Sequence, residues 1–145
     1  MASPTPPTDA PPRTALVVAD LMFAARLRQA LERMGWGVEM TSSAAAVERL
    51  RQSPPALVLL ELGPPGRIDV IRDAIAGGVS APILAFGSHK QRGMLHEARE
   101  AGAALVVSNG TLVARFEQMV AKACGGAGAD EDRLLIDEDD DPPAV

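Results

Sequence analysis

The chain has little cysteine, histidine or aromatic side chain: its 145 residues include one cysteine, two histidines, three phenylalanines, one tryptophan and no tyrosine. A single cysteine, Cys124, excludes a disulfide within the chain and favours a reducing cytoplasm as its location. The histidines and the cysteine form no compact cluster, so they predict no metal site. Few rings are available to stack on a flavin, and we expect no cofactor.

Long hydrophobic runs and a basic excess are also lacking. No apolar run approaches the roughly 18 residues that a membrane span needs, and the first residues do not form a secretory signal. The net charge is −5, of which residues 130–145 carry −7, which leaves +2 for residues 1–129. A nearly neutral body with an acidic tail is unlike the strongly basic surface of a nucleic-acid binder. We therefore expect neither a membrane nor a nucleic acid as a partner.

Proline and glycine divide the chain into three parts. Residues 1–13 contain five prolines, which resist helices and sheets alike, and they predict a disordered arm. Residues 14–124 carry regular apolar patterns and predict the folded domain. Residues 125–145 begin with glycine and alanine and continue as an acidic block, which predicts a flexible tail.

The folded part alternates five times between a short apolar run and a helical pattern. Strands are predicted at 15–19, 36–40, 56–61, 82–86 and 103–107. Helices are predicted at 22–34, 43–52, 67–76, 90–101 and 111–123. Helical crossovers favour a parallel sheet, because each returns the chain to the same end of the sheet. The expected fold class is therefore α/β, as a three-layer α/β/α sandwich around five parallel strands.

The run from Ala56 to Leu62 is the central feature of the pattern. Its residues are apolar without alternation as far as Leu60, which fits a strand buried on both faces. A carboxylate, Glu61, follows, and then the turn Gly63-Pro64-Pro65-Gly66. In open parallel sheets ligands bind beyond the carboxyl ends of the strands. Glu61 is therefore the first candidate site residue.

Several stretches together resemble a response-regulator receiver domain of the chemotaxis-regulator type. They are residues 15–20, 56–61, 64–66, 82–86 and 101–104, and the resemblance spans about residues 14–124. It implies a flavodoxin-like sheet with the strand order 2-1-3-4-5. It also implies a role in bacterial two-component signalling through contact with other proteins.

The resemblance also identifies the positions that would carry phosphorylation. The family's pair of metal-binding acids falls on Ala19 and Asp20, so one carboxylate is lost. The phospho-accepting aspartate falls on Glu61, one methylene longer. The Ser/Thr of the fourth strand falls on Gly87, with Ser88 beside it. The lysine of the fifth strand falls on Asn109, and we expect no other cation to replace it.

These changes predict a degenerate pseudo-receiver that is not an enzyme and has no catalytic residue. Phosphoryl transfer depends on positioning and on charge neutralisation by metal and cationic side chains, and little of that set is left. Two alternatives stay open: an atypical phospho-acceptor that uses Glu61 or Asp20, and a small-ligand sensor at the same crevice. Glu61 itself is interpreted as a polar strand end bonded to local amides, with a mimic of phospho-aspartate as the second choice.

We expect a stand-alone adaptor, monomeric or weakly dimeric, that docks on signalling proteins. The resemblance implies a contact surface around the fourth helix, fifth strand and fifth helix. Its candidate members are Lys90, Arg92, Arg99, Arg115 and Lys122. A further apolar segment, Leu21-Met22-Phe23, fits either core packing or an exposed patch for a partner.

The acidic tail contains a second candidate motif, the aliphatic residues Leu134, Leu135 and Ile136. A purely solubilising tail has no use for them. Acidic segments with embedded aliphatic residues often order on a groove rimmed by basic residues. The motif therefore predicts either docking on a partner or folding back on the domain's own Lys/Arg face; a solvated tail is the third possibility.

Overall fold

The computed structural model describes residues 13–63, 67–125 and 134–135. Five parallel strands are arranged in the predicted order, β2-β1-β3-β4-β5. They are β1 (Thr14–Val18), β2 (Gly37–Met40), β3 (Leu57–Glu61), β4 (Ile83–Gly87) and β5 (Leu105–Ser108). The predicted arm except Arg13, the Pro64–Gly66 turn and most of the predicted tail, Ile136 included, lie outside the described residues.

A short sixth strand lies beside the five predicted strands. β6 (Leu134–Leu135) pairs with β5 in parallel, with Val106 opposite Leu134 and Val107 opposite Leu135. Two residues are too few to carry an alternating or continuous apolar pattern of their own. Of the two versions left open for the tail motif, the described residues support folding back, here as strand pairing on β5.

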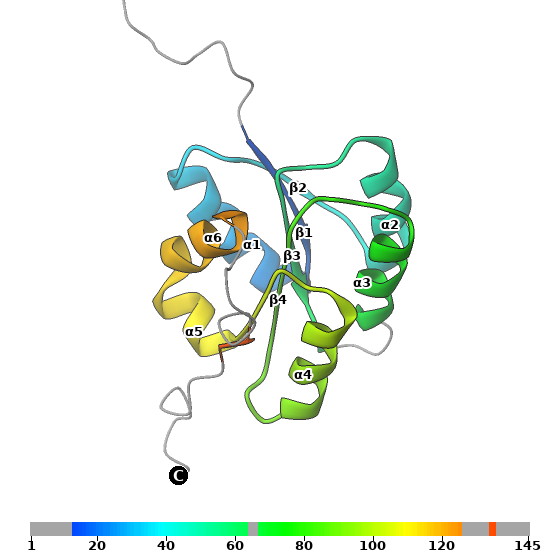
Figure 1. Cartoon of the computed structure of the whole chain (residues 1–145). Helices are drawn as coiled ribbons and strands as arrows, with labels where there is room; N and C mark the ends of the chain where they lie inside the picture. The colour runs from blue at the N-terminus through cyan, green and yellow to red at the C-terminus, as the bar shows by residue number, and fades with distance from the viewer. Residues whose placement is uncertain (1–12, 64–66, 126–133, 136–145) are drawn as a thin grey trace, which may run out of the picture.

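The described residues form six helices, and Figure 1 shows them covering the two faces of the sheet. They are α1 (Leu21–Arg33), α2 (Ser43–Gln52), α3 (Arg67–Ala76), α4 (Arg92–Ala101), α5 (Asn109–Ala114) and α6 (Phe116–Gly125). α2, α3 and α4 lie on one face, and α1, α5 and α6 lie on the other. The single last helix that the sequence predicted from 111 is therefore wrong: helix begins directly after β5 and breaks at Arg115.

The central strand explains the layering. Leu57, Val58, Leu59 and Leu60 are all buried. Because successive strand residues point to opposite faces, Leu57 and Leu59 join one hydrophobic cluster while Val58 and Leu60 join the other. A strand buried on both faces has room for a polar side chain only at its end, and Glu61 is the last residue of β3.

The register brings the strand ends to one edge of the sheet, here called the carboxyl edge. Val18 lies opposite Leu60, Glu61 opposite Phe86, and Gly87 opposite Ser108.

Among the described residues no helix is both long enough and apolar enough to cross a membrane.

Candidate functional site

The carboxyl edge gathers the site residues that the sequence predicted. Ala19 and Asp20 follow β1, Glu61 ends β3, Gly87 ends β4, and Asn109 follows β5 as the first residue of α5. These residues are up to 90 positions apart in the chain, yet parallel pairing places their strand ends side by side.

Glu61 and Asp20 are connected through the backbone. The amide of Asp20 donates to Glu61 Oε1 across 2.8 Å. The Asp20 side chain turns the other way and accepts from the amide of Phe23 at 2.9 Å, which makes it the N-cap of α1. Glu61 thus accepts a hydrogen bond from a backbone amide at the end of its strand, and the Asp20 side chain caps α1.

Arg67 is the site residue that sequence reasoning missed. Its Nη1 donates to the backbone oxygen of Glu61 at 2.9 Å and to that of Val18 at 3.4 Å, and it lies 3.8 Å from Glu61 Oε1. The exposed fractions of the two side chains are only 12% for Arg67 and 14% for Glu61. The expectation that no cation replaces the family's lysine is therefore wrong, because one arrives from the start of α3.

The signal for Arg67 in the sequence is weak but identifiable. It is the first residue after the Gly/Pro turn, six positions beyond Glu61. An arginine there can reach back across the turn, because its long side chain carries a planar fork of five donors. Arg67 Nη1 donates to two backbone oxygens, one in β1 and one in β3, and so holds the ends of these neighbouring strands together.

The residues at this edge do not fit a magnesium site. Magnesium wants near-octahedral oxygen ligands, usually with one or two carboxylates among them. Ala19 supplies no oxygen from its side chain, Asp20 caps a helix, and Glu61 is bonded by an amide and faces a guanidinium. Within the described part of the chain no group of three or more His, Cys, Asp or Glu residues could hold a metal ion.

Gly87 marks a place where apolar packing has replaced a polar side chain. A Cβ atom at this position would lie 3.3 Å from Leu95 Cδ2 and 3.5 Å from Leu62 Cβ. Leu62 and Leu95 are both fully buried. Ser88, the neighbour considered as a substitute, uses its Oγ to accept from the amide of Lys90 at 3.1 Å. Its hydroxyl therefore shapes the turn that leads into α4.

The end of β5 is built around two buried hydroxyls that sequence reasoning also missed. Ser108 Oγ accepts from the amide of Thr111 at 3.2 Å and donates to Thr111 Oγ1 at 3.0 Å. Both residues are buried. Ser108 is thus the N-cap of α5, which explains why helix starts at Asn109 without a loop. A serine three residues before a threonine, ahead of an apolar pair, was the available signal.

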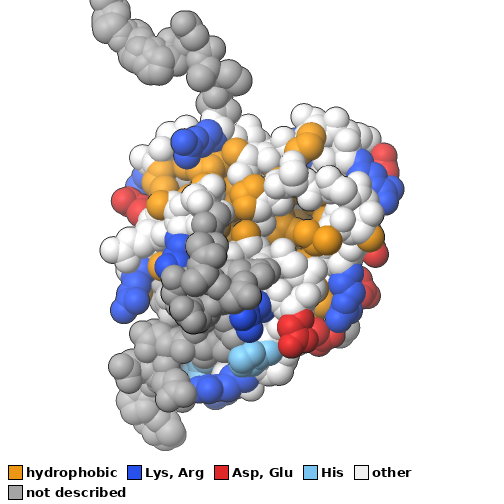
Figure 2. All heavy atoms as spheres, viewed as in Figure 1, with side chains coloured by type: hydrophobic (Ala, Val, Ile, Leu, Met, Phe, Trp, Pro, Cys, Tyr) orange, Lys and Arg blue, Asp and Glu red, His pale blue; other side chains and the backbone are white. Residues whose placement is uncertain are grey.

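The predicted contact surface is distributed on both sides of β5. Lys90 precedes α4, Arg92 and Arg99 belong to α4, Arg115 joins α5 to α6, and Lys122 lies in α6. Lys90, Arg92 and Arg115 are exposed, whereas Arg99 and Lys122 are half-buried. Figure 2 shows Lys, Arg and His side chains close together in the lower part of one face. Its role in binding stays a prediction.

The start of α1 presents an apolar pair beside the carboxyl edge. The exposed fraction is 81% for Leu21 and 80% for Met22. Phe23, the next residue, instead packs inward with its ring centroid 5.0 Å from that of Phe86. The two interpretations left open for this segment therefore apply to different residues: Phe23 is partly buried and packs against the core, whereas Leu21 and Met22 are exposed.

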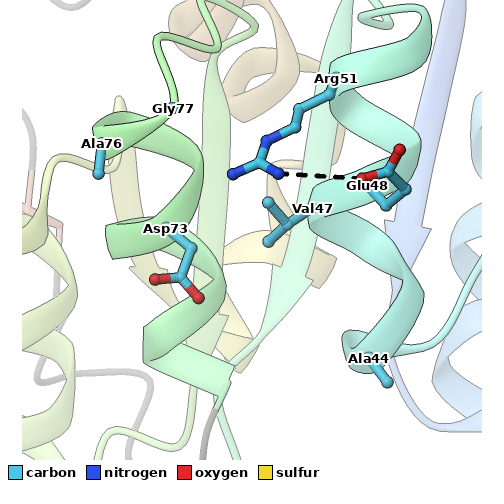
Figure 3. Close-up of a pocket in the computed structure, with 7 residues that line it drawn as sticks. All are labelled: Ala44, Val47, Glu48, Arg51, Asp73, Ala76 and Gly77. Atoms are coloured by element: carbon cyan, nitrogen blue, oxygen red, sulfur yellow. Dashed lines mark ion pairs between the residues drawn. The ribbon is translucent and has the colours of Figure 1, made fainter.

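A hollow of about 420 Å³ lies between α2 and α3, on their solvent side (Figure 3). In it Arg51 lies 3.9 Å from Glu48 on the same helix, and Asp73 faces them from α3. The remaining lining residues are Ala44, Val47, Ala76 and Gly77. None of them belongs to the carboxyl edge, so this hollow is separate from the candidate site.

Comparison with known proteins supports the fold and nothing narrower. No protein-family model matches the sequence, and no curated protein is similar to it. Among solved structures, a two-component response regulator of the LuxR family from Aurantimonas sp. SI85-9A1 is 24% identical, with a TM-score of 0.70 over 86% of this chain and 89% of that chain.

Two further structures agree with it. FixJ-N is 17% identical, with a TM-score of 0.71 over 83% of this chain and 98% of that chain. A response regulator from Burkholderia pseudomallei, solved with a phosphorylated aspartic acid, is 19% identical, with a TM-score of 0.64 over 77% of this chain and 66% of that chain. The chain therefore has the fold of a receiver domain.

Proposed function

We propose that this protein is a pseudo-receiver, a cytoplasmic module that binds signalling proteins in bacterial-type two-component systems without being phosphorylated. The observation that carries the proposal is the Arg67–Glu61 pair, which places the chain's own cation against the carboxylate at the acceptor position. The receiver fold supports a role in signalling, and the residues at the carboxyl edge support a role without phosphorylation.

Phosphorylation of a carboxylate at this edge would have to overcome three features at once. The carboxylate would have to attack while its Oε1 atom is held by the Asp20 amide and lies 3.8 Å from the Arg67 guanidinium, which fixes its orientation. Charge on the transferred group would need a metal, for which Ala19 offers no ligand. A side chain at position 87 would place its Cβ atom 3.3 Å from Leu95 Cδ2, so Leu95 would have to move slightly to admit it. Each feature weakens acceptance, and together they favour binding without phosphorylation.

The same pair also favours a second candidate, in which Glu61 acts as a permanent substitute for a phosphorylated acceptor. A glutamate brings one charge and two oxygens where a phosphoryl group brings nearly two charges and three oxygens. With Arg67 beside it, however, that single charge has a partner that ties β3 to the start of α3. In this version Glu61→Gln would weaken partner binding, whereas a purely structural Glu61 would leave it nearly unchanged.

The proposal is tested by incubating the full-length protein with acetyl phosphate and magnesium and measuring its intact mass. A competent receiver domain in the same tube shows that the donor is active. We expect the competent domain to gain a phosphate and this protein to gain none. A stoichiometric phosphate adduct that disappears in Glu61→Gln or Asp20→Asn would contradict the proposal and assign an atypical phospho-acceptor instead.

A further inference from the structure

The outer edge of β5 is occupied by a segment from the far end of the chain. β6 is hydrogen-bonded to β5 as the last strand of the sheet, and Figure 1 shows it as the short orange-red segment near α5. Residues 126–133 connect it to α6. Without β6 the sheet would end at β5, which is four residues long and fully buried in its side chains.

The backbone geometry of β5 shows which groups that edge would leave open. The amide of Ala104 donates to the backbone oxygen of Ile83, the first residue of β4, at 2.9 Å. Successive strand residues direct their N–H and C=O groups to opposite sides. The backbone groups of Leu105 and Val107 therefore point away from β4, toward β6. Groups of this kind at a sheet edge form a template for another extended chain.

The covering strand is short enough to be exchanged. Among the described residues, two residue pairs join β6 to β5, and a typical hydrogen bond contributes about 0.5–1.5 kcal/mol net. A tethered segment has the advantage of an effective concentration of about millimolar order. A partner segment that makes a longer ladder on the same edge can therefore compete with it.

The charges near the edge indicate the chemistry of such a partner. The sequence around β6 carries Asp130, Glu131 and Asp132 before it and Asp137 and Glu138 after it. α4 contacts β6, and α4 carries Arg92 and Arg99 together with Glu97 and Glu100, so its charges are balanced. The preference for aliphatic residues between acids therefore follows from the sequence of the segment that occupies the edge, and the edge itself supplies the backbone groups.

We propose that the outer edge of β5 is a strand-addition site for an extended acidic–aliphatic segment of a partner protein, and that Leu134–Leu135 occupies it in the free protein as an intramolecular competitor. This inference rests on the proposed role as an interaction module and names the partner's binding segment. It does not involve the carboxyl edge, so its failure would leave the phosphate experiment unaffected.

The test uses the full-length protein and a labelled synthetic peptide of residues 130–141 as the probe. The peptide is titrated into the wild type, into Leu134→Ser with Leu135→Ser, and into Asp139→Asn with Asp140→Asn as a matched change in the same tail. We expect the double serine variant to bind the peptide at least tenfold more tightly than the other two proteins. A peptide with both leucines replaced by serine should not bind.

Amide hydrogen exchange gives a second readout that does not depend on the peptide's affinity. The amides of Leu105 and Val107 should exchange slowly in the wild type and faster in the double serine variant, and added peptide should restore the slow rate. Amides of β3 serve as internal controls, because both edges of β3 are paired in every variant.

Several outcomes would overturn the proposal. Equal peptide binding by all three proteins, or no binding to the double serine variant up to millimolar peptide, would exclude strand exchange. If the peptide with both leucines replaced by serine bound as tightly as the original peptide, the charge of the peptide alone would explain its binding. Concentration-dependent dimerisation of the wild type that is lost in the double serine variant would assign the edge to the tail of a second copy instead of a different partner.

Discussion

Arg67, the first residue of α3, donates from Nη1 to the backbone oxygen of Glu61, the last residue of β3, across 2.9 Å. The same nitrogen reaches Val18 at 3.4 Å and lies 3.8 Å from the Glu61 carboxylate. One side chain thus joins the ends of two strands and gives the acceptor-position carboxylate a cation from within the chain. The stability of the carboxyl edge should depend on it.

Replacing Arg67 by Gln should lower the free energy of unfolding by about 1.5–3 kcal/mol, the range for hydrogen bonds to charged groups. The reason is that Glu61, only 14% exposed, would lose its cation while remaining in place. Urea unfolding measures the loss. Arg72→Gln is the matched control, because Arg72 also bonds carboxylates, those of Asp69 and Glu97, but is half exposed. An equal loss in both variants would show that Arg67 is only another surface arginine.

Gly87→Thr should destabilise the fold by about 1–3 kcal/mol through overpacking. A Cβ there already lies 3.3 Å from Leu95 Cδ2, and threonine adds a methyl and a hydroxyl. The same substitution in a Leu95→Ala background should cost clearly less, because the opposing side chain has been shortened. Thermal or urea unfolding of the four proteins gives the comparison. An identical cost in both backgrounds would mean that Leu95 does not limit this position.

The pair of Glu39 and Arg49 predicts a dependence of stability on pH. Two contacts of 2.7 Å join the carboxylate to the guanidinium, and these hydrogen bonds hold the pKa of Glu39 below its ordinary value of 4.5. A lowered pKa stabilises the fold above pH 4.5, and that contribution is lost as the pH falls through the pKa of the folded state. Glu39→Gln should therefore cost stability at neutral pH and little in acid.

The size of that effect should be modest. The Glu39 side chain is 42% exposed, so solvent screens the pair, and we expect about 0.5–1 kcal/mol at pH 7. Unfolding midpoints of wild type and Glu39→Gln, measured from neutral to acidic pH, should converge below pH 4.5. A difference that stays constant across this range would show that the carboxylate's charge is not responsible.

Restoring ligands at the carboxyl edge should strengthen metal binding there. Ala19→Asp adds the missing carboxylate, and Arg67→Gln removes the competing guanidinium from Glu61. The two changes together should strengthen magnesium binding by at least tenfold over the wild type, measured by calorimetry. Ala19→Asn is the matched control for shape without charge. Equal affinity in all variants would mean that neither position controls the site.

The layered fold was predictable because its signals are local and repeated. The uninterrupted run from Leu57 to Leu60 indicated a strand buried on both faces, and the structure buries all four residues. Parallel pairing then brought Asp20, Glu61 and Gly87 to one edge, as expected from their positions at strand ends.

The features that could not be predicted depend on tertiary contacts, which leave no periodic pattern of apolar residues in the sequence. The reach of Arg67 back to Glu61 is set by the path of the turn between them. The close approach of Leu95 to Gly87 depends on how α4 sits on the sheet. β6 has only two residues, so its pairing with β5 comes from tertiary proximity and not from strand propensity.

The most direct test of whether the chain's own guanidinium takes the place of a metal at this edge is a magnesium titration of the full-length wild type. The backbone amide signals of Asp20 and Glu61 report on it, because the Asp20 amide donates to the Glu61 carboxylate. We predict no saturation below about a millimolar of magnesium, which corresponds to about −4 kcal/mol of binding free energy. Saturation in the micromolar range, about −8 kcal/mol, would contradict this prediction and identify a working metal site.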